Sequence, residues 1–278
     1  MNFNSEFMIL HQEEVPYLTY KKLDEIPCVR HAFSTRLGGV SEGEFTSMNL
    51  SFGRGDSDEN VHENYRRICK SAGFEYESLV ASKHIHETVV RKVSKENSGV
   101  GIYKPVDIPS VDALVTNDPQ VTLVTYYADC TPVFFVDPEK RAIGLAHAGW
   151  RGTVGEISKK VVAKMSVEFS TNPEDLICAI GPVIGKCCYE VSKDCAEKFA
   201  KLFTWDSPVI TRTENSDKFM IDLSLANKLI LMGAGVKEEN IVISDLCTKC
   251  NSDLLWSHRA TSGKRGTMSA FMQLRLTL

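Results

Sequence analysis

The chain has 278 residues, 43% of them hydrophobic and 24% charged, and its formal net charge is -4 at neutral pH. These values are ordinary for a globular protein that buries a sizeable core, and the acidic balance argues against a nucleic-acid-binding protein, which is usually basic. No apolar run is long enough to cross a bilayer, so we also expect no membrane-spanning protein.

Strand-like apolar runs follow one another along the chain and do not alternate regularly with helices. This order favours an α+β fold with mixed, sandwich-like β-sheets flanked by helices, rather than a doubly wound fold. No repeat or linker divides the chain, so we expect a single domain over 1–278, with about the first 25 residues at its periphery. The runs lie at residues 28–33, 79–86, 113–118, 121–128, 132–137, 141–147, 176–181 and 269–274.

Three segments have helical patterns. Residues 58–72 end before Gly73, and residues 222–232 end before Gly233, a residue typical of a helix stop. Residues 153–169 repeat apolar side chains at helical spacing, and Thr153 with Glu156 fits a capping box. The sequence therefore predicts a helix that begins a few residues after His147.

A turn links the two central strand-like runs at 137–140 (DPEK), because proline presets the second turn position. If the strands fold back there, Asp137 faces Lys140, and counting outward places Cys130 opposite His147. Side chains of such cross-strand neighbours lie on one face, with Cβ atoms about 4.5–5.5 Å apart. The pair could then be a nucleophile with its base, two metal ligands, or ordinary core residues.

Gly149 and Gly152 bracket Trp150 and Arg151 immediately after His147. Free backbone N–H groups at the start of the following helix, together with Arg151, would favour a bound anion. The glycines could equally well serve only to allow a tight strand-to-helix turn.

A third metal ligand could come from His84 or His86, which lie on the same face if this segment is a strand. With Cys130 and His147, one of these histidines would complete a three-ligand zinc site. Catalytic zinc commonly has three protein ligands and one open position for water or substrate.

Several blocks, in this order, are similar to the signature blocks of one family. The blocks are HAFSTRLGGVSEGEFTSMNL, HIHE, ADCTPVFFVD, AHAGWRGT, IGPVIGKCCYEV and SHRATSGKRG. The sequence resembles the laccase-domain family, long labelled multicopper polyphenol oxidases and now described as zinc-containing purine nucleoside phosphorylases. The resemblance covers the chain from about residue 30 to its end.

The resemblance implies that His86, Cys130 and His147 are the metal ligands and the catalytic residues. In this chain His84 replaces the glutamine, and Glu87 the glycine, of the usual Gln-Val-His-Gly block. The implied reactions are phosphorolysis of adenosine, inosine, guanosine and S-methyl-5′-thioadenosine to a base and a sugar 1-phosphate, and deamination of adenosine. Zinc is the expected cofactor, and copper could occupy the same site adventitiously.

Phosphorolysis needs cationic groups that hold phosphate beside the anomeric carbon. The sequence predicts Arg36, Arg151 and Arg259 for this role, and Arg36 is the first choice because two glycines follow it closely. The region from Arg259 to Arg265 could instead be a solvated surface loop.

Two further cysteine motifs have weaker interpretations. Cys247-Thr-Lys-Cys250 has the spacing of half a zinc ribbon, and no second half of that pattern is found in the sequence. Cys187-Cys188 either helps to shape the family's site or packs in a turn.

Two alternatives to the zinc enzyme remain. One is a metal-free cysteine hydrolase with Cys130 as nucleophile and His147 as base. The other is a copper oxidase, which the seven histidines of the chain disfavour because a four-copper centre uses more.

The expected partners are purine nucleosides and inorganic phosphate, without nucleic acid or membrane, in a monomer or small homo-oligomer. The N-terminal residues MNFNSEFMILHQEEV are acidic where a signal peptide is basic. An odd number of cysteines, nine, disfavours a disulfide framework, so we expect a cytoplasmic protein with reduced thiols.

Overall fold

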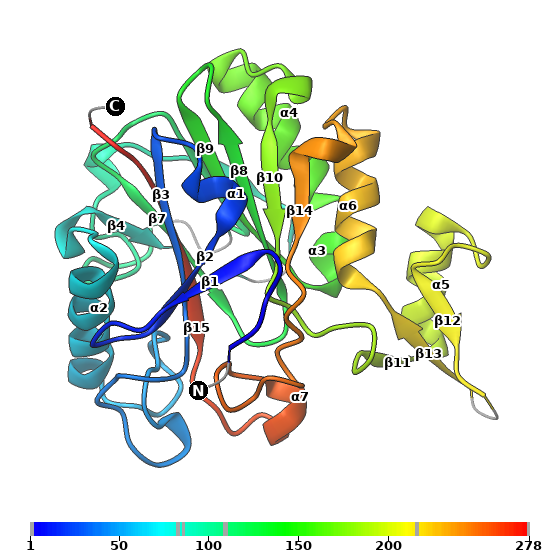
Figure 1. Ribbon diagram of the computed structural model, residues 1–278, viewed down its shortest axis with the longest axis horizontal. Helices are drawn as coiled ribbons and strands as arrows, with labels where there is room; N and C mark the ends of the chain where they lie inside the picture. Colours follow the sequence, from blue (N-terminus) through cyan, green and yellow to red (C-terminus); the bar gives the residue numbers. More distant parts are fainter. Residues whose placement is uncertain (1–2, 82–83, 85–86, 108–110, 215–216, 277–278) are drawn as a thin grey trace.

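The computed structural model describes residues 3–81, 84, 87–107, 111–214 and 217–276. In these residues, most strands belong to two six-stranded sheets, and three strands form a separate small sheet. Helices flank the sheets (Figure 1). The predicted α+β fold with mixed sheets, flanking helices and a single domain is confirmed.

The first sheet is mostly antiparallel. Its outer two strands come from the N-terminal segment, which we expected at the periphery, and Met8 and Leu18 of these strands are buried. Only the pairing of its last two strands is parallel among the described residues. In sheet order the strands are β1 (Met8–His11), β2 (Tyr17–Tyr20), β3 (Val29–Ser34), β15 (Met268–Leu274), β7 (Thr122–Tyr127) and β4 (Leu79–Ala81).

The second sheet has its two longest strands in the centre. These strands, β8 and β9, are consecutive in the chain and form an antiparallel hairpin, and every residue of the two strands is buried. In sheet order the strands are β14 (Ile241–Ile243), β10 (Ile177–Ile180), β8 (Thr131–Asp137), β9 (Ala142–Ala148), β6 (Ala113–Thr116) and β5 (Val90–Lys92).

The main core lies between the two sheets, and the strand alternation shows which side chains reach it. On β8, Phe134 belongs to the inter-sheet cluster, whereas Phe135 packs in the cluster outside the second sheet. On β9, Leu145 faces inward and Ala146 outward in the same way. Both faces are covered, so the central strands are apolar throughout rather than alternating with polar residues.

Helices cover the outer faces of this sandwich. The helix α2 (Asp58–Ala72) packs on the first sheet, and α4 (Ile157–Phe169) packs on the second sheet, with α6 (Leu223–Gly233) beside it (Figure 1). The prediction of helix 58–72 is confirmed in full, since Ser57 caps its start and Gly73 ends it in the left-handed conformation. The remaining helices are α1 (Lys21–Asp24), α3 (Trp150–Val154), α5 (Lys193–Phe203) and α7 (His258–Thr261).

The single helix predicted over 153–169 is wrong, because the segment divides into α3 and α4. Glu156 adopts φ 55° between them, and its side chain does not cap the second helix. Thr153 lies inside α3, where its hydroxyl accepts a hydrogen bond from the Asn227 amide at 3.1 Å, so it cannot be the N-cap residue of a capping box. A tertiary contact thus overrides a local sequence signal.

The predicted register of the central hairpin is also wrong, by two positions. Asp137 pairs with Ala142 rather than Lys140, so His147 lies opposite Pro132 and not Cys130. A two-residue hairpin turn needs φ above zero at its first position in the favoured types, and proline cannot adopt it. A shift by two preserves the face, so Cys130 and His147 both still point between the sheets.

A small subassembly stands beside the sandwich. Its three-stranded sheet consists of β11 (Glu190–Ser192), β13 (Lys218–Ile221) and β12 (Ile210–Arg212), and α5 packs on it (Figure 1). Together with the start of α6 it surrounds a core cluster that includes Phe199 and Ile184. None of the helices seen in the described ranges is long and apolar enough to cross a membrane.

Candidate functional site

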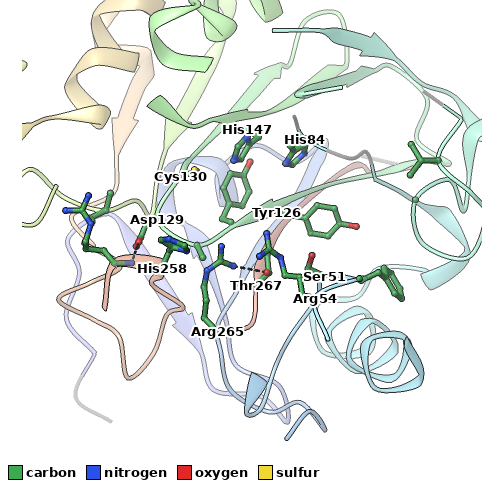
Figure 2. A pocket seen from close by; sticks show the side chains of 18 of the residues that line it. Ser51, Arg54, His84, Tyr126, Asp129, Cys130, His147, His258, Arg265 and Thr267 are labelled. Carbon is green, nitrogen blue, oxygen red and sulfur yellow. Dashed lines mark hydrogen bonds between the residues drawn. The ribbon is translucent and has the colours of Figure 1, made fainter. Parts of the chain in front are cut away.

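A pocket of about 800 Å³ lies where strands of both sheets end. This volume falls within the range of small-molecule sites, about 300–1,000 Å³. Figure 2 shows Cys130, His147 and His84 along one side of the pocket, and Arg265 and Arg54 with the His258 imidazole along the other. The polar groups that line it are Ser51, Arg54, His84, Tyr126, Tyr127, Asp129, Cys130, His147, Tyr189, His258, Arg259, Arg265 and Thr267.

Cys130 reaches the pocket because the chain crosses from one sheet to the other between β7 and β8. Asp129 makes this crossing with a backbone φ of 85°, a conformation that residues other than glycine rarely adopt. Its carboxylate accepts hydrogen bonds from the Thr248 hydroxyl at 2.6 Å and from the Arg259 backbone N–H at 2.7 Å. These two bonds hold the strained turn and fix the position of the neighbouring thiol.

His147 lies near the end of β9, and its ring stacks against the ring of His84 with centroids 4.4 Å apart. The Asp112 carboxylate, which is fully buried, lies 3.9 Å from Nδ1 of His147. This separation is too long for a hydrogen bond, but a carboxylate beside Nδ1, with Nε2 left for another ligand, is common around metal-binding histidines.

Of the strand predicted over 79–86, the structure describes β4, which ends at Ala81, and residues 82–83 and 85–86 lie outside the described residues, so the same-face argument for His84 and His86 stays a prediction. His84 lies beyond the strand and lines the pocket. His86, the ligand that the resemblance implies, lies outside the described residues.

The environment of Cys130 bears on the choice between nucleophile and ligand. Burial, and to a smaller extent the nearby Asp129, raise the pKa of this thiol to about 12, although the charge of Arg265 opposes them. A metal-free thiol with this pKa has little thiolate at neutral pH, which disfavours the cysteine-hydrolase alternative. A metal ion would take the place of the proton.

The donor set fits zinc on its chemistry. Cys130 and His147, with a histidine from the 84–86 segment, offer one sulfur and two nitrogens, as in known three-ligand catalytic sites. The cavity in front of these groups leaves space for a further ligand.

The opposite side of the pocket is cationic. Arg265 is buried and donates to the carbonyl of Gly266 at 3.0 Å and to Thr267 Oγ1 at 3.1 Å. Its Nε finds no hydrogen-bond acceptor among the described residues. Burial lowers the pKa of Arg265 to about 10, and the neighbouring Arg54 adds to this effect, so the group is still charged at neutral pH.

His258 lies next to these arginines in the lining. Partial burial, followed by the charge of Arg265, lowers the pKa of this imidazole. The neutral ring can therefore either donate or accept a hydrogen bond in the physiological range.

The arginines predicted from the sequence have different locations. Arg259 lines the pocket, but its guanidinium donates to the backbone carbonyl of Glu190 at 3.0 Å. In the described part of the chain, Arg36 and Arg151 are not among the lining residues. Arg36 donates to the carbonyl of Ser252 at 2.8 Å and stacks over a tryptophan ring.

Arg54 was not singled out from the sequence, although Ser51-Phe52-Gly53-Arg54 has a glycine beside its arginine much as the Arg36 block does. Arg265 was noted only within a stretch of cations near the C-terminus. The signal that could have selected both is their position just before a helix or strand, at an edge where other elements also end.

Fold and pocket together define a two-sheet α+β sandwich protein in which thiol and imidazole donors face arginines across one cavity. The chain belongs to the family described as "Multi-copper polyphenol oxidoreductase laccase", which matches residues 30–275. This confirms the resemblance seen in the sequence blocks.

Relatives with assigned names cover most of the chain. The purine nucleoside phosphorylase YlmD of Geobacillus stearothermophilus is 37% identical over 243 residues, which are 87% of this chain and 89% of that protein. The purine nucleoside phosphorylase YlmD of Bacillus subtilis is 34% identical over 244 residues, 87% of each chain. The crystal structure of YlmD from Geobacillus stearothermophilus matches with a TM-score of 0.90 and 34% identity, and covers 96% of this chain and 99% of that one.

Proposed function

We propose that this protein is a zinc-dependent purine nucleoside phosphorylase. Its substrates would be adenosine, inosine, guanosine and S-methyl-5′-thioadenosine, which react with inorganic phosphate to give a free base and a sugar 1-phosphate. The observation that carries the proposal is the pocket that joins Cys130 and His147 to Arg54 and Arg265. The names of the relatives support it.

Phosphate would bind at the arginine side of the pocket. Within the described residues, Arg265 forms no ion pair and its buried Nε has no hydrogen-bond partner, and Arg54 is exposed beside it. Two guanidinium groups give the fork-shaped donors that phosphate oxygens prefer. An anion between them would relieve both the mutual repulsion and the unpaired donor.

The nucleoside would lie along the lining between the two polar sides. Phe52, Tyr126 and Tyr189 offer aromatic surface, and Ile184 adds apolar surface. A purine ring packs well on such surfaces. The sugar would then face the phosphate, so that a phosphate oxygen bonds to the anomeric carbon as the bond to the base nitrogen breaks.

Cys130 and His147 would hold the zinc ion, with His86 as the third ligand that the resemblance implies and His84 as the alternative. Zinc bound here would supply a Lewis acid and lower the pKa of a bound water towards about 7. Asp112 would orient the ring of His147 through Nδ1.

Deamination of adenosine to inosine belongs to the proposal on the resemblance alone. It needs hydroxide to attack the purine at neutral pH. Phosphorolysis does not need it, and so the two activities can be separated in one assay.

Product analysis tests the proposal. Purified protein is incubated with adenosine or inosine, with and without inorganic phosphate, and the bases and ribose 1-phosphate are quantified. We expect ribose 1-phosphate only when phosphate is present, and inosine from adenosine in both conditions. Free ribose and base without any need for phosphate would instead indicate a nucleoside hydrolase.

A further inference from the structure

Four cysteines from two distant loops meet outside the pocket. Cys187 and Cys188 lie in a turn between β10 and β11, and Cys247 and Cys250 follow β14. All four Sγ atoms lie within 4.8 Å of one another. The second half of the zinc-ribbon pattern, which the sequence did not reveal, is thus supplied by two adjacent cysteines about 60 residues away.

The spacing of the sulfur atoms fits one metal ion. A zinc–sulfur distance of about 2.3 Å in a tetrahedral site places the sulfurs about 3.8 Å apart. The Sγ atom of Cys250 lies 3.7 Å from that of Cys187 and 3.5 Å from that of Cys188. A disulfide would need about 2.05 Å, so the thiols have the separation of metal ligands rather than of a bonded pair.

The backbone around the cluster is shaped for the sulfurs. A side chain at Gly185 would come within 3.1 Å of the Cys247 Cβ and 3.2 Å of the Cys187 Sγ. The N–H group of Gly185 donates to the Cys247 Sγ at 3.2 Å. Glycine at this position therefore leaves space for the sulfurs and lets a backbone donor stabilise a thiolate.

The two loops are also joined by backbone contacts, so the ligands are positioned before any ion binds. Val183 and Cys247 form a parallel bridge, and the Thr248 N–H donates to the Val183 carbonyl at 3.0 Å. The Cys188 N–H donates to the Gly185 carbonyl at 2.9 Å, which closes the turn that carries both adjacent cysteines.

We propose that Cys187, Cys188, Cys247 and Cys250 bind one zinc ion at a structural site separate from the pocket. Four soft sulfur ligands in tetrahedral arrangement select zinc among the common divalent ions, and they leave no open position for substrate. Lys249, which lies between Cys247 and Cys250 in sequence, would offset part of the negative charge of a zinc tetrathiolate, whereas Lys186 donates to the Pro208 carbonyl at 2.9 Å.

This site would stiffen one wall of the pocket. Ile184 and Tyr189, which line the pocket, flank the cysteine turn in sequence. Thr248, within the other cysteine pair, donates to Asp129 beside Cys130. A zinc ion across the two loops closes a long chain segment, and such closures stabilise most when the segment is long.

Metal analysis of the His147→Ala variant tests the proposal, because this variant lacks a ligand of the pocket site. Protein purified under reducing conditions without chelator should keep about one zinc per chain, and X-ray absorption should show about four sulfurs at about 2.3 Å. No bound zinc, or zinc with nitrogen or oxygen ligands, would overturn the proposal. Iron with four sulfurs would overturn the assignment of the ion.

A second pair of variants keeps the test independent of the pocket. Cys250→Ser should remove about one zinc per chain from the otherwise unchanged protein, whereas Cys195→Ser should remove none, since Cys195 on α5 is outside the cluster. Equal zinc content in the two variants would contradict the site. A disulfide between two of these cysteines would also contradict the site. It would appear as an intact mass two hydrogens below that of the reduced chain, and this difference would disappear after reduction and in Cys250→Ser.

Discussion

Two groups of thiols in this protein have opposite surroundings. Cys130 lines the pocket together with the stacked imidazole groups of His84 and His147. The four-cysteine cluster contains sulfur ligands alone and lies at the surface, with Cys187 and Cys250 exposed. Mixed ligands beside a cavity suit an ion that must also bind substrate, whereas four sulfurs suit an ion that only holds loops together.

A hydrogen bond between Thr248 and Asp129 joins the two thiol regions. Thr248 lies between Cys247 and Cys250, and its hydroxyl donates to the Asp129 carboxylate at 2.6 Å. Asp129 precedes Cys130 and has the strained backbone that carries the chain between the sheets. A change in the loop that carries Cys247 and Cys250 can therefore shift Asp129 and the neighbouring Cys130 in the pocket.

The largest effect is expected from the pocket ligand. His147→Ala should lower kcat/KM for phosphorolysis by more than about 100-fold, since losing even an outer partner of a metal ligand reduces activity or affinity 10–100-fold. Far-ultraviolet circular dichroism should be unchanged, and zinc content should fall by about one ion per chain. His11→Ala, on the outer strand β1, is the matched control and should retain activity. Full turnover by His147→Ala would remove the pocket metal from the mechanism.

A smaller effect is expected at the cationic side. Arg54→Ala should raise the KM for phosphate about 10-fold or more, because a charge-assisted hydrogen bond contributes at least about 1.5 kcal/mol. The KM for nucleoside should change less. Arg66→Ala, an exposed arginine on α2, is the control for the loss of one surface charge.

Arg36→Ala decides between the sequence-based and the structure-based assignments of the phosphate ligand. Its guanidinium binds the Ser252 carbonyl and lies outside the pocket lining, so we expect lower stability and an unchanged KM for phosphate. A raised KM in Arg36→Ala but not in Arg54→Ala would favour the assignment made from the sequence. Initial rates over a phosphate series for both variants provide the measurement.

The sequence predicted correctly a helix whose first and last residues are set by neighbouring residues in the chain. The helix 58–72 begins at the Ser57 cap and ends at Gly73, and neither depends on distant residues. The helix predicted to begin at Thr153 failed because Thr153 lies inside α3, where its hydroxyl bonds to Asn227, more than 70 residues away. The hairpin register failed because Arg141 extends the turn with φ 49°.

The candidate site divides in the same way. Cys130 and His147 could be assigned to one site from the sequence because Cys130 directly precedes β8, His147 lies on β9, and a shift of two positions does not change the face. Arg54 could not be found, since it reaches the pocket from a loop before α2. The cysteine cluster depends on the contact of two loops that no local pattern encodes.

The link between the two thiol regions can be weakened by Thr248→Val. This change leaves an Asp129 oxygen without its buried donor, so the free energy of unfolding should fall by about 1–3 kcal/mol. Activity should fall only a few-fold, because no pocket group is removed. Thr211→Val, at an exposed position on β12, is the control. It should change neither the free energy of unfolding, measured in urea, nor the rate of phosphorolysis. A loss of activity as large as that of His147→Ala would mean that Thr248 acts directly in the site.

The smallest effect on turnover is expected at His31, a buried histidine far along the sequence from both thiol regions. Its Nε2 accepts the Tyr20 N–H at 2.7 Å, which requires the neutral ring. Burial lowers its pKa to about 3, and the charges of His11 and Arg275 contribute, while Asp24 lies 3.7 Å from Nδ1. An unfolded histidine has a pKa of about 6.5, so the unfolded chain binds the proton first as the pH falls.

Stability should therefore decrease as the pH falls below about 6.5, by up to about 1.4 kcal/mol per pH unit, until the pH approaches the folded pKa of about 3. His31→Gln keeps an acceptor for the Tyr20 N–H but cannot titrate, so its urea midpoint should be lower at pH 7 and vary less between pH 7 and pH 5. Turnover at pH 7 should match the unmodified protein. The comparison separates the titration of His31 from acid release of metal, which would abolish activity and lower the unfolding midpoint to the same extent in both proteins. An unchanged pH dependence in His31→Gln would assign the acid sensitivity to the metal ligands instead.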